Sequence, residues 1–254
     1  MIKLLLGNPR GTIAPELYSM LLENLGRTIY DGVWVGDGGP IPNKAGCRLD
    51  TIEAFRELGM SVVRFPGGTA ADYYRWRDGI GPRSKRPRTW SFAHGGEDTN
   101  EFGTDEYLQF CEAVGADACI KLNPVSAPFH EALDWIQYCN HNGNTTLANL
   151  RRQNGHPEPY GVKYWIIGNE CADAWSPEGY AELVHQWAFF IRLVDPKAKI
   201  IATAWDQAWN ARFLKKYADL ASGGMVQSNP MGLVGDQIQP GLMLFTRILC
   251  LARS

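Results

Sequence analysis

The alternation of short apolar runs with amphipathic stretches through the first 217 residues constrains the fold of this chain more than any other feature. Five of the apolar runs have the composition of buried strands, at residues 18–22, 61–65, 118–122, 162–167 and 199–204. Amphipathic helices are expected between them, with starts at Asp50, Thr104 and Ser176. This alternation predicts an α/β fold with a parallel sheet, and the length of 254 residues fits a single (β/α)8 TIM barrel.

The composition changes after about residue 219. Only Asp236, Arg247 and Arg253 are charged in residues 220–254, whereas 20% of the whole chain is charged. We therefore expect two parts, a partial barrel over residues 1–219 and a divergent tail over residues 220–254. The apolar run at residues 242–252 is too short to span a bilayer. Three interpretations of the tail stay open: a helix at an oligomer contact, a frayed end, or translated sequence foreign to the original fold.

Charge and residue spacing argue against several classes of function. The formal net charge is −2 and neither sign forms a long block, so nucleic acid and membranes are not expected partners. The six cysteines contain no C-x-x-C pair and the five histidines no H-x-H or H-E-x-x-H array, so no metal site is expected. The apolar run near the N-terminus is shorter than a signal sequence requires, which predicts a cytoplasmic protein.

Polar side chains lie at or near the ends of four predicted strands. These residues are Glu23, Arg64, Asn123, Asn169 and Glu170. In a βα-barrel the C-terminal ends of the strands meet at one mouth, so we expect these side chains to face one basin. Arg64 needs a carboxylate or a polar ligand opposite it, because an unpaired guanidinium is costly to bury, and Glu23 is the expected partner. A bracing ion pair and a clamp on sugar hydroxyls both stay open.

Aromatic residues are dense near the same strand ends. Four of them follow the second predicted strand: Tyr73, Tyr74, Trp76 and Trp90. Flat aromatic rings present an apolar face on which a sugar ring can stack, so this cluster favours a carbohydrate ligand. The alternative is ordinary burial in the core, which we expect for Trp165 and Trp187.

Six segments carry a resemblance to a known family. They are residues 21–27 (LLENLGR), 63–68 (VRFPGG), 74–82 (YRWRDGIGP), 100–106 (NEFGTDE), 131–135 (EALDW) and 164–170 (YWIIGNE). In this order they resemble the family 51 glycoside hydrolases, chiefly α-L-arabinofuranosidases, over about residues 10–217. The resemblance implies a retaining hydrolase on a (β/α)8 barrel followed by a β-sandwich, with no metal or organic cofactor.

The resemblance also implies roles for individual residues. Glu170 matches the general acid/base of the family, and Asn169 matches the residue that holds the sugar 2-hydroxyl. Glu23 and Arg64 match groups that grip the arabinofuranose, and Trp90 matches an aromatic residue near the same pocket. A general acid must hold its proton near neutral pH, so we expect Glu170 to be partly desolvated.

The chain departs from the family at the second catalytic carboxylate. A retaining glycosidase needs a nucleophile about 5–5.5 Å from the acid/base. The family has this Glu after the seventh strand, whereas no Glu follows Glu182 here. We therefore expect an incomplete barrel of about five β/α units without the β-sandwich, and impaired activity of the chain alone. Asp206 and Asp173 are candidates to replace the nucleophile. The open barrel edges are expected to be covered by the apolar tail or by a second copy in a homo-oligomer.

The predicted substrate is a terminal α-L-arabinofuranosyl residue of an arabinoxylan or arabinan oligosaccharide. Two alternatives stay open: an endo-β-1,4-glucanase or xylanase of the same family, and a non-catalytic sugar-binding remnant. The missing second carboxylate favours the remnant. The presence of Glu23, Arg64, Asn169 and Glu170 favours the enzyme.

Overall fold

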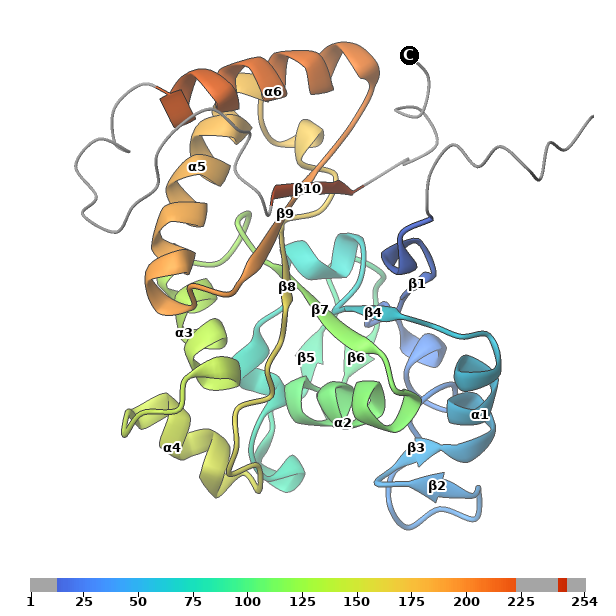
Figure 1. Cartoon of the computed structure of the whole chain (residues 1–254). Coiled ribbons are helices and arrows are strands. Elements are labelled where there is room, and N and C mark those ends of the chain that lie inside the picture. Colours follow the sequence, from blue (N-terminus) through green and yellow to red (C-terminus); the bar gives the residue numbers. More distant parts are fainter. Residues whose placement is uncertain (1–12, 223–241, 246–254) are drawn as a thin grey trace, which may run out of the picture.

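A computed structural model describes residues 13–222 and 242–245 of the chain. Its main element is a sheet of six strands in the order β1-β4-β7-β8-β9-β10 (Figure 1). The strands are β1 (Ser19–Leu21), β4 (Val62–Phe65), β7 (Asp117–Leu122), β8 (Tyr164–Ile167), β9 (Lys199–Thr203) and β10 (Leu242–Phe245). All neighbouring strands in this sheet pair in parallel, so the C-terminal ends of the strands lie along one edge.

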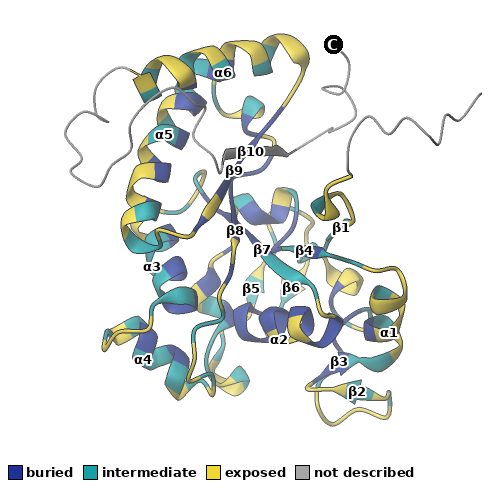
Figure 2. Cartoon of the chain, viewed as in Figure 1, coloured by how far each residue is buried: buried dark blue, intermediate teal, exposed yellow. Residues whose placement is uncertain are grey.

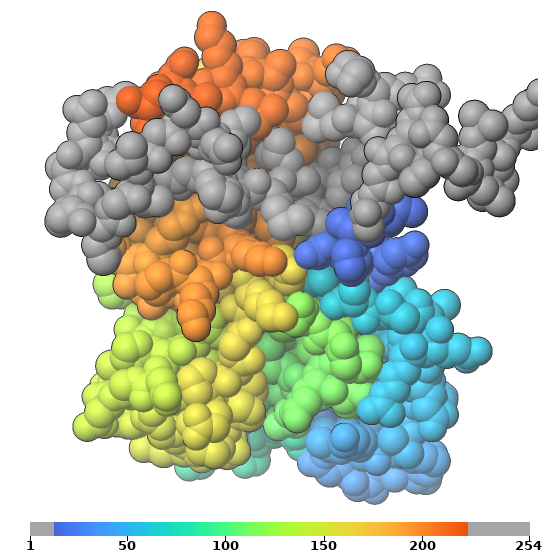
Figure 3. All heavy atoms as spheres, in the orientation of Figure 1, coloured from blue at the N-terminus to red at the C-terminus, as the bar shows by residue number. Residues whose placement is uncertain are grey.

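Helices connect the strands and cover the sheet. They are α1 (Leu49–Glu57), α2 (Thr104–Val114), α3 (Phe129–Asn140), α4 (Thr146–Gln153), α5 (Pro177–Val194) and α6 (Gln207–Ser222). In the space-filling view the colours change from blue through green to orange across the molecule, so segments that follow one another in sequence lie side by side (Figure 3). Within residues 13–222 and 242–245, no helix has both the length and the apolar character that crossing a membrane requires.

Two short hairpins extend from this α/β layer arrangement. The first joins β2 (Asn43–Lys44) to β3 (Cys47–Arg48), and the second joins β5 (Thr89–Trp90) to β6 (Glu97–Asp98). The second hairpin belongs to the long connection between β4 and α2. Trp90 belongs to β5, and His94 lies in the turn that joins β5 to β6.

The five predicted strands are confirmed as β1, β4, β7, β8 and β9, with ends that differ by one or two residues. The sixth strand, β10, was not predicted, and it pairs with β9 from Leu242↔Ile200 to Phe245↔Thr203. Periodicity alone cannot distinguish a strand from a helix in so short an apolar run. The expected boundary at residue 219 falls inside α6, and β10 lies beyond it. The division of the chain into two parts stays a prediction.

The two faces of the sheet carry separate apolar clusters. The larger core lies between sheet and helices and includes Trp165 (0% exposed) and Trp187 (5% exposed), as expected for both. The opposite, inner face carries a smaller cluster: Val62, Cys119, Tyr164, Ile166 and Ile201. Its members on one strand are two residues apart, which is the side-chain period of a strand. Figure 2 shows β8 in the dark blue of buried residues, because all four of its residues are buried.

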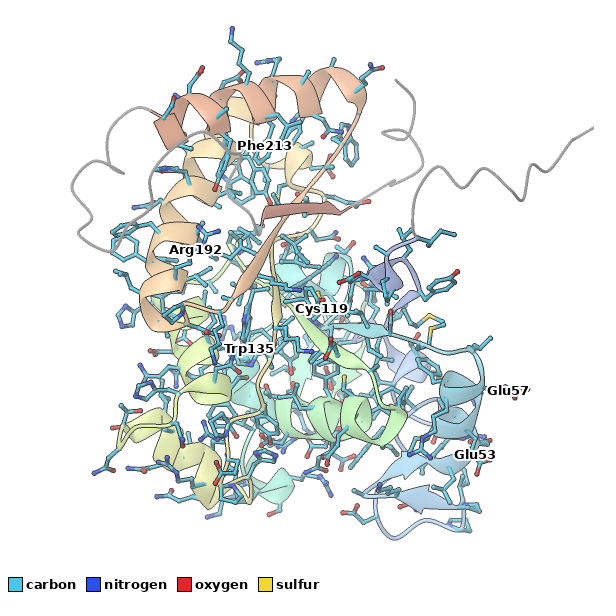
Figure 4. The ribbon with its side chains drawn as sticks, viewed as in Figure 1. Glu53, Glu57, Cys119, Trp135, Arg192 and Phe213 are labelled. Carbon is cyan, nitrogen blue, oxygen red and sulfur yellow. The ribbon has the colours of Figure 1, made fainter. Side chains whose placement is uncertain are left out.

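The helices present apolar sides inward and charged sides outward. Phe213 of α6 contacts Tyr180 of α5 with ring centroids 5.4 Å apart, whereas Glu53 and Glu57 extend from α1 away from the sheet (Figure 4). The Ser176 start of α5 is confirmed, because Ser176 Oγ accepts the Gly179 N–H at 3.1 Å.

The other two helices also begin within one residue of the expected positions, at Leu49 and Thr104, but neither Asp50 nor Thr104 caps its helix. Asp50 lies inside the first turn of α1 and pairs with Arg48 at 2.6 Å, so it does not cap the helix. Thr104 is the first residue of α2, and its hydroxyl accepts the Trp135 Nε1–H at 3.0 Å. The Gly103 N–H donates instead to Glu106 Oε2 at 2.9 Å.

A buried ion pair braces the long connection between β4 and α2. Arg86 Nη2 lies 2.9 Å from Glu106 Oε1, and the two side chains are 3% and 5% exposed. Arg86 also donates to the carbonyl oxygens of Gly81 (2.9 Å) and Asn100 (2.8 Å). The Arg86 guanidinium therefore links Gly81 and Asn100, which lie on either side of the β5–β6 hairpin, to Glu106 of α2.

Candidate active site

Glu23 lies two residues after β1, and the turn that follows β4 closes against it. Its Oε1 accepts the Ala70 N–H (3.3 Å) and lies 3.0 Å from His94 Nε2. A Cβ at Gly67, whose φ is +140°, would lie 2.4 Å from Glu23 Cγ, so the turn needs glycine to come this close. The Glu23 side chain is 19% exposed. Its carboxylate is therefore held by neighbours and still open to a ligand.

The predicted ion pair between Arg64 and Glu23 is wrong. Glu23 pairs with His94, which is 71 residues further along the chain, and Arg64 forms no ion pair with any described residue. Arg64 is half-buried on the inner face, and its Nε is buried without a hydrogen-bond partner among those residues. A buried donor without a partner is costly, and Arg64 lines a separate small cavity of about 10 Å³ on the inner face.

Asn169 is held from two sides after β8. Lys121 Nζ of β7 donates to Asn169 Oδ1 at 2.7 Å, and both residues are buried. The Asn169 N–H donates to Asp72 Oδ1 at 3.3 Å. Burial raises the pKa of Asp72 to about 6, and the charge of Glu170 contributes to the rise. Asp72 and Glu170 are therefore close enough to repel each other when both are ionised.

Glu170 follows Asn169 in a strained turn. Its φ and ψ are 41° and 42°, a left-handed conformation that few non-glycine residues adopt. The preceding Gly168 has a φ of +72°, and a Cβ there would lie 2.4 Å from Cys171 Sγ. The turn projects Glu170 into solvent, where the residue is exposed. The expectation that Glu170 is partly desolvated is therefore wrong for this structure.

A cavity of about 270 Å³ lies between the end of β1 and the β5–β6 hairpin, and Glu23 is not among its lining residues. Its lining includes Asn24, Tyr73, Trp90, Phe92 and Asp98. Asn24 Nδ2 donates to Asp98 Oδ2 at 2.7 Å, which ties the end of β1 to the β5–β6 hairpin. Trp90 is 60% exposed, so its ring is available for stacking on the cavity wall. Tyr74 also lines this cavity although it is buried, whereas Trp76 is buried in the core and does not line it.

Two of the other predicted polar groups accept hydrogen bonds from nearby main-chain N–H groups. Asn123 Oδ1 accepts the N–H groups of Val125 (3.1 Å) and Ser126 (2.9 Å), so it shapes a turn. Asp206 Oδ1 accepts the Trp209 N–H at 2.8 Å at the start of α6, and Asp173 is exposed. Among the residues that the structure describes, no cluster of His, Cys, Asp and Glu could hold a metal ion.

Two residues of this region escaped the sequence analysis. Lys121 interrupts an apolar strand as Arg64 does, so the argument used for Arg64 could have found it. Asp72 carries no such signal, because it lies in an irregular stretch between the Gly-rich turn and the aromatic cluster. Only the fold brings Asp72 to Asn169, which is 97 residues away in sequence.

The raised pKa of Asp72 makes a prediction for Asp72→Asn. A carboxyl group whose pKa rises from 3.8 to about 6 on folding binds its proton more tightly in the folded state. The free energy of unfolding therefore falls as pH increases through this interval. Asp72→Asn removes that loss, and we expect the variant to be more stable than wild type by about 1–2 kcal/mol at pH 8.

Urea denaturation at pH 3.5 and pH 8 measures this difference. At the lower pH the wild-type carboxyl is mostly protonated, and the two proteins should have similar free energies of unfolding. The exposed Asp173→Asn serves as the control, with no gain at either pH. Equal effects of Asp72→Asn at both pH values would contradict the assigned burial.

Sequence comparison connects this arrangement with known proteins. The profile of the alpha-L-arabinofuranosidase 1 domain matches residues 54–229. The chain belongs to this family. Alpha-L-arabinofuranosidase C of Emericella nidulans is 42% identical to this chain over 205 residues. The matched segment covers 76% of this chain and 40% of the Emericella nidulans protein.

Solved structures of the family agree with the fold. The α-L-arabinofuranosidase of Thermotoga maritima in complex with arabinose has a TM-score of 0.75 and 39% identity, over 80% of this chain and 43% of that one. The family 51 arabinofuranosidase of Thermotoga petrophila gives 0.76 and 39%, over 80% and 44% of the two chains. The resemblance to family 51 and the TIM-barrel type of fold are thus confirmed. This arabinofuranosidase-family chain spans about two fifths of the length of the curated relatives it matches.

Proposed function

We propose that the chain provides the sugar-binding and proton-donating side of a retaining α-L-arabinofuranosidase site. The observation that carries the proposal is that Glu23, Asn169 and Glu170 follow β1 and β8 at the C-terminal edge of one parallel sheet, where Asn24, the sequence neighbour of Glu23, lines the same cavity as Trp90. The substrate we propose is a terminal α-L-arabinofuranosyl group of an arabinoxylan or arabinan oligosaccharide. The named relatives are arabinofuranosidases, which supports this substrate over a glucan or xylan backbone.

In the proposed reaction Glu23 and Asn169 hold the sugar, and Arg64 contributes donors from the inner face. Glu170 donates a proton to the leaving glycosidic oxygen as the bond to the anomeric carbon breaks. A retaining mechanism also needs a carboxylate nucleophile, and no Glu follows Glu182 in this sequence. Asp206, the best-placed substitute by topology, accepts the Trp209 N–H through one oxygen at the start of α6 and is exposed. We therefore propose that the chain alone binds the sugar more readily than it cleaves it.

Two measurements on the purified chain test this proposal. Calorimetry should detect binding of L-arabinose, and an aryl α-L-arabinofuranoside should release more product than a β-glucan or xylan is shortened. Trp90→Ala should weaken sugar binding, whereas Phe189→Ala, which removes a partly exposed ring from α5, should leave it unchanged. Absence of both binding and turnover would reject the proposal.

The second candidate function is a sugar-binding protein without turnover. The exposure of Glu170 favours it, because a solvated carboxyl lacks the apolar surroundings that help a general acid hold its proton. Arabinose binding with no release from either substrate would select this candidate. The cytoplasmic location and the homo-oligomer stay predictions.

A further inference from the structure

A buried lysine lies directly beneath the turn that carries the candidate acid. Lys121 is 4% exposed, and its side chain shares the inner face of β7 with Cys119, which Figure 4 labels at the centre of the sheet. Its ammonium group touches neither Glu23 nor Glu170 and donates to Asn169 Oδ1 at 2.7 Å. Lys121 is therefore engaged with a site residue, although it takes no part in the proposed reaction.

We propose that Lys121 is a positioning residue that fixes the rotation of the Asn169 carboxamide, so that the amide nitrogen faces the open side of the site. An ammonium group has three donors and no acceptor, so it can meet only the oxygen end of a carboxamide. Asn169 Nδ2 is then turned away from Lys121. No described residue accepts from Nδ2, and both of its N–H groups remain for a ligand.

The Asn169 main chain is fixed independently of this contact. Its N–H donates to Asp72 Oδ1 at 3.3 Å, so Asp72 holds the backbone while Lys121 sets the side-chain rotation. A carboxamide held in this way presents its two N–H donors to a sugar oxygen, whereas its carbonyl oxygen is engaged by Lys121. The identity of that ligand rests on the proposed function, whereas the orientation of the amide does not.

The proposal has a pH dependence with a defined direction. Burial, together with the positive charge of neighbouring Arg64, lowers the pKa of Lys121 to about 8. A neutral amine can accept as well as donate a hydrogen bond. Above this pH, Lys121 therefore no longer selects the oxygen of the Asn169 carboxamide over its nitrogen. The charged or titratable groups that face Lys121 come from β4, from β7 itself, from the turn after β4 and from the end of β1: Arg64, Cys119, Asp72 and Glu23.

Nuclear magnetic resonance of the Asn169 side-chain amide tests the orientation without a substrate. In wild type, the Nδ2 signals should titrate with a midpoint near pH 8, because Lys121 loses its proton there. Lys121→Met removes every donor and should shift these signals and abolish the titration. Lys121→Arg retains an obligate donor that stays charged, so it should keep the wild-type orientation and lose the titration near pH 8.

Binding of L-arabinose provides the second readout. Lys121→Met should weaken it roughly tenfold, equivalent to one hydrogen bond, and Lys121→Arg should restore it. Asn169 signals that are the same in wild type and Lys121→Met would overturn the positioning role. A wild-type chain whose Asn169 signals behave as expected but which binds no arabinose would reject the proposed function and leave the positioning role intact.

Discussion

Glu170→Ala is expected to lower the rate of arabinose release from an arabino-oligosaccharide by about 10²–10⁴-fold, the usual contribution of a general acid. The oligosaccharide is a poor leaving group, so its departure requires a proton from Glu170. An activated aryl arabinofuranoside leaves with little help, so its rate should fall much less. The ratio of the two losses is the quantity to measure, from initial rates on both substrates.

The control for this variant is another glutamate that is outside the site. Glu178 on α5 pairs with Arg212 at 2.7 Å in an exposed position, and Glu178→Ala should leave both rates unchanged. Equal losses on the two substrates in Glu170→Ala would contradict the role of Glu170 as proton donor. A wild-type chain that releases arabinose from neither substrate would reject hydrolysis by this chain altogether.

Arg86→Ala is expected to reduce the free energy of unfolding by about 3–5 kcal/mol, because it leaves a buried carboxylate without its main partner. Glu106 is 5% exposed, and only Arg83, at 3.1 Å and 34% exposed, would remain to pair with it. The carbonyl oxygens of Gly81 and Asn100 would also lose a donor. Chemical denaturation monitored by tryptophan fluorescence measures the change.

The matched control is an arginine two residues away. Arg88 pairs with Glu97 at 2.7 Å, and both side chains are about two-thirds exposed (65% and 66%). Solvent screens such a pair, so Arg88→Ala should show no measurable loss. The same loss in both variants would mean that the Arg86 pair is not buried in solution.

The strands were predictable because short apolar runs that alternate with amphipathic stretches are typical of the buried strands of an α/β fold. The four residues of β4 alternate between the helix-covered core and the inner face, with Val63 and Phe65 on one side and Arg64 on the other. The helices begin within one residue of Asp50 and Thr104, but neither residue caps its helix, because each side chain has a competing partner. Arg48 takes the Asp50 carboxylate, and Trp135 takes the Thr104 hydroxyl.

The site was predictable only where a strand end identifies it. Glu23 and the Asn169–Glu170 pair were placed correctly at the edge of the sheet, whereas the partner of Glu23 was not. His94 reaches Glu23 through a hairpin whose position depends on the buried Arg86 pair, and no local pattern encodes that path. The solvent exposure of Glu170 likewise depends on the left-handed turn after β8.

The two outermost strands in the described part of the sheet are short, which limits strand addition by another chain at the sheet edges. At one border, Ser19–Leu21 offers only three residues of main chain, too short a template for a foreign segment to add to firmly. At the other, Leu242–Phe245 shields β9 from direct addition. In the described part of the sheet, neither border is therefore a long template on which another polypeptide could add a strand.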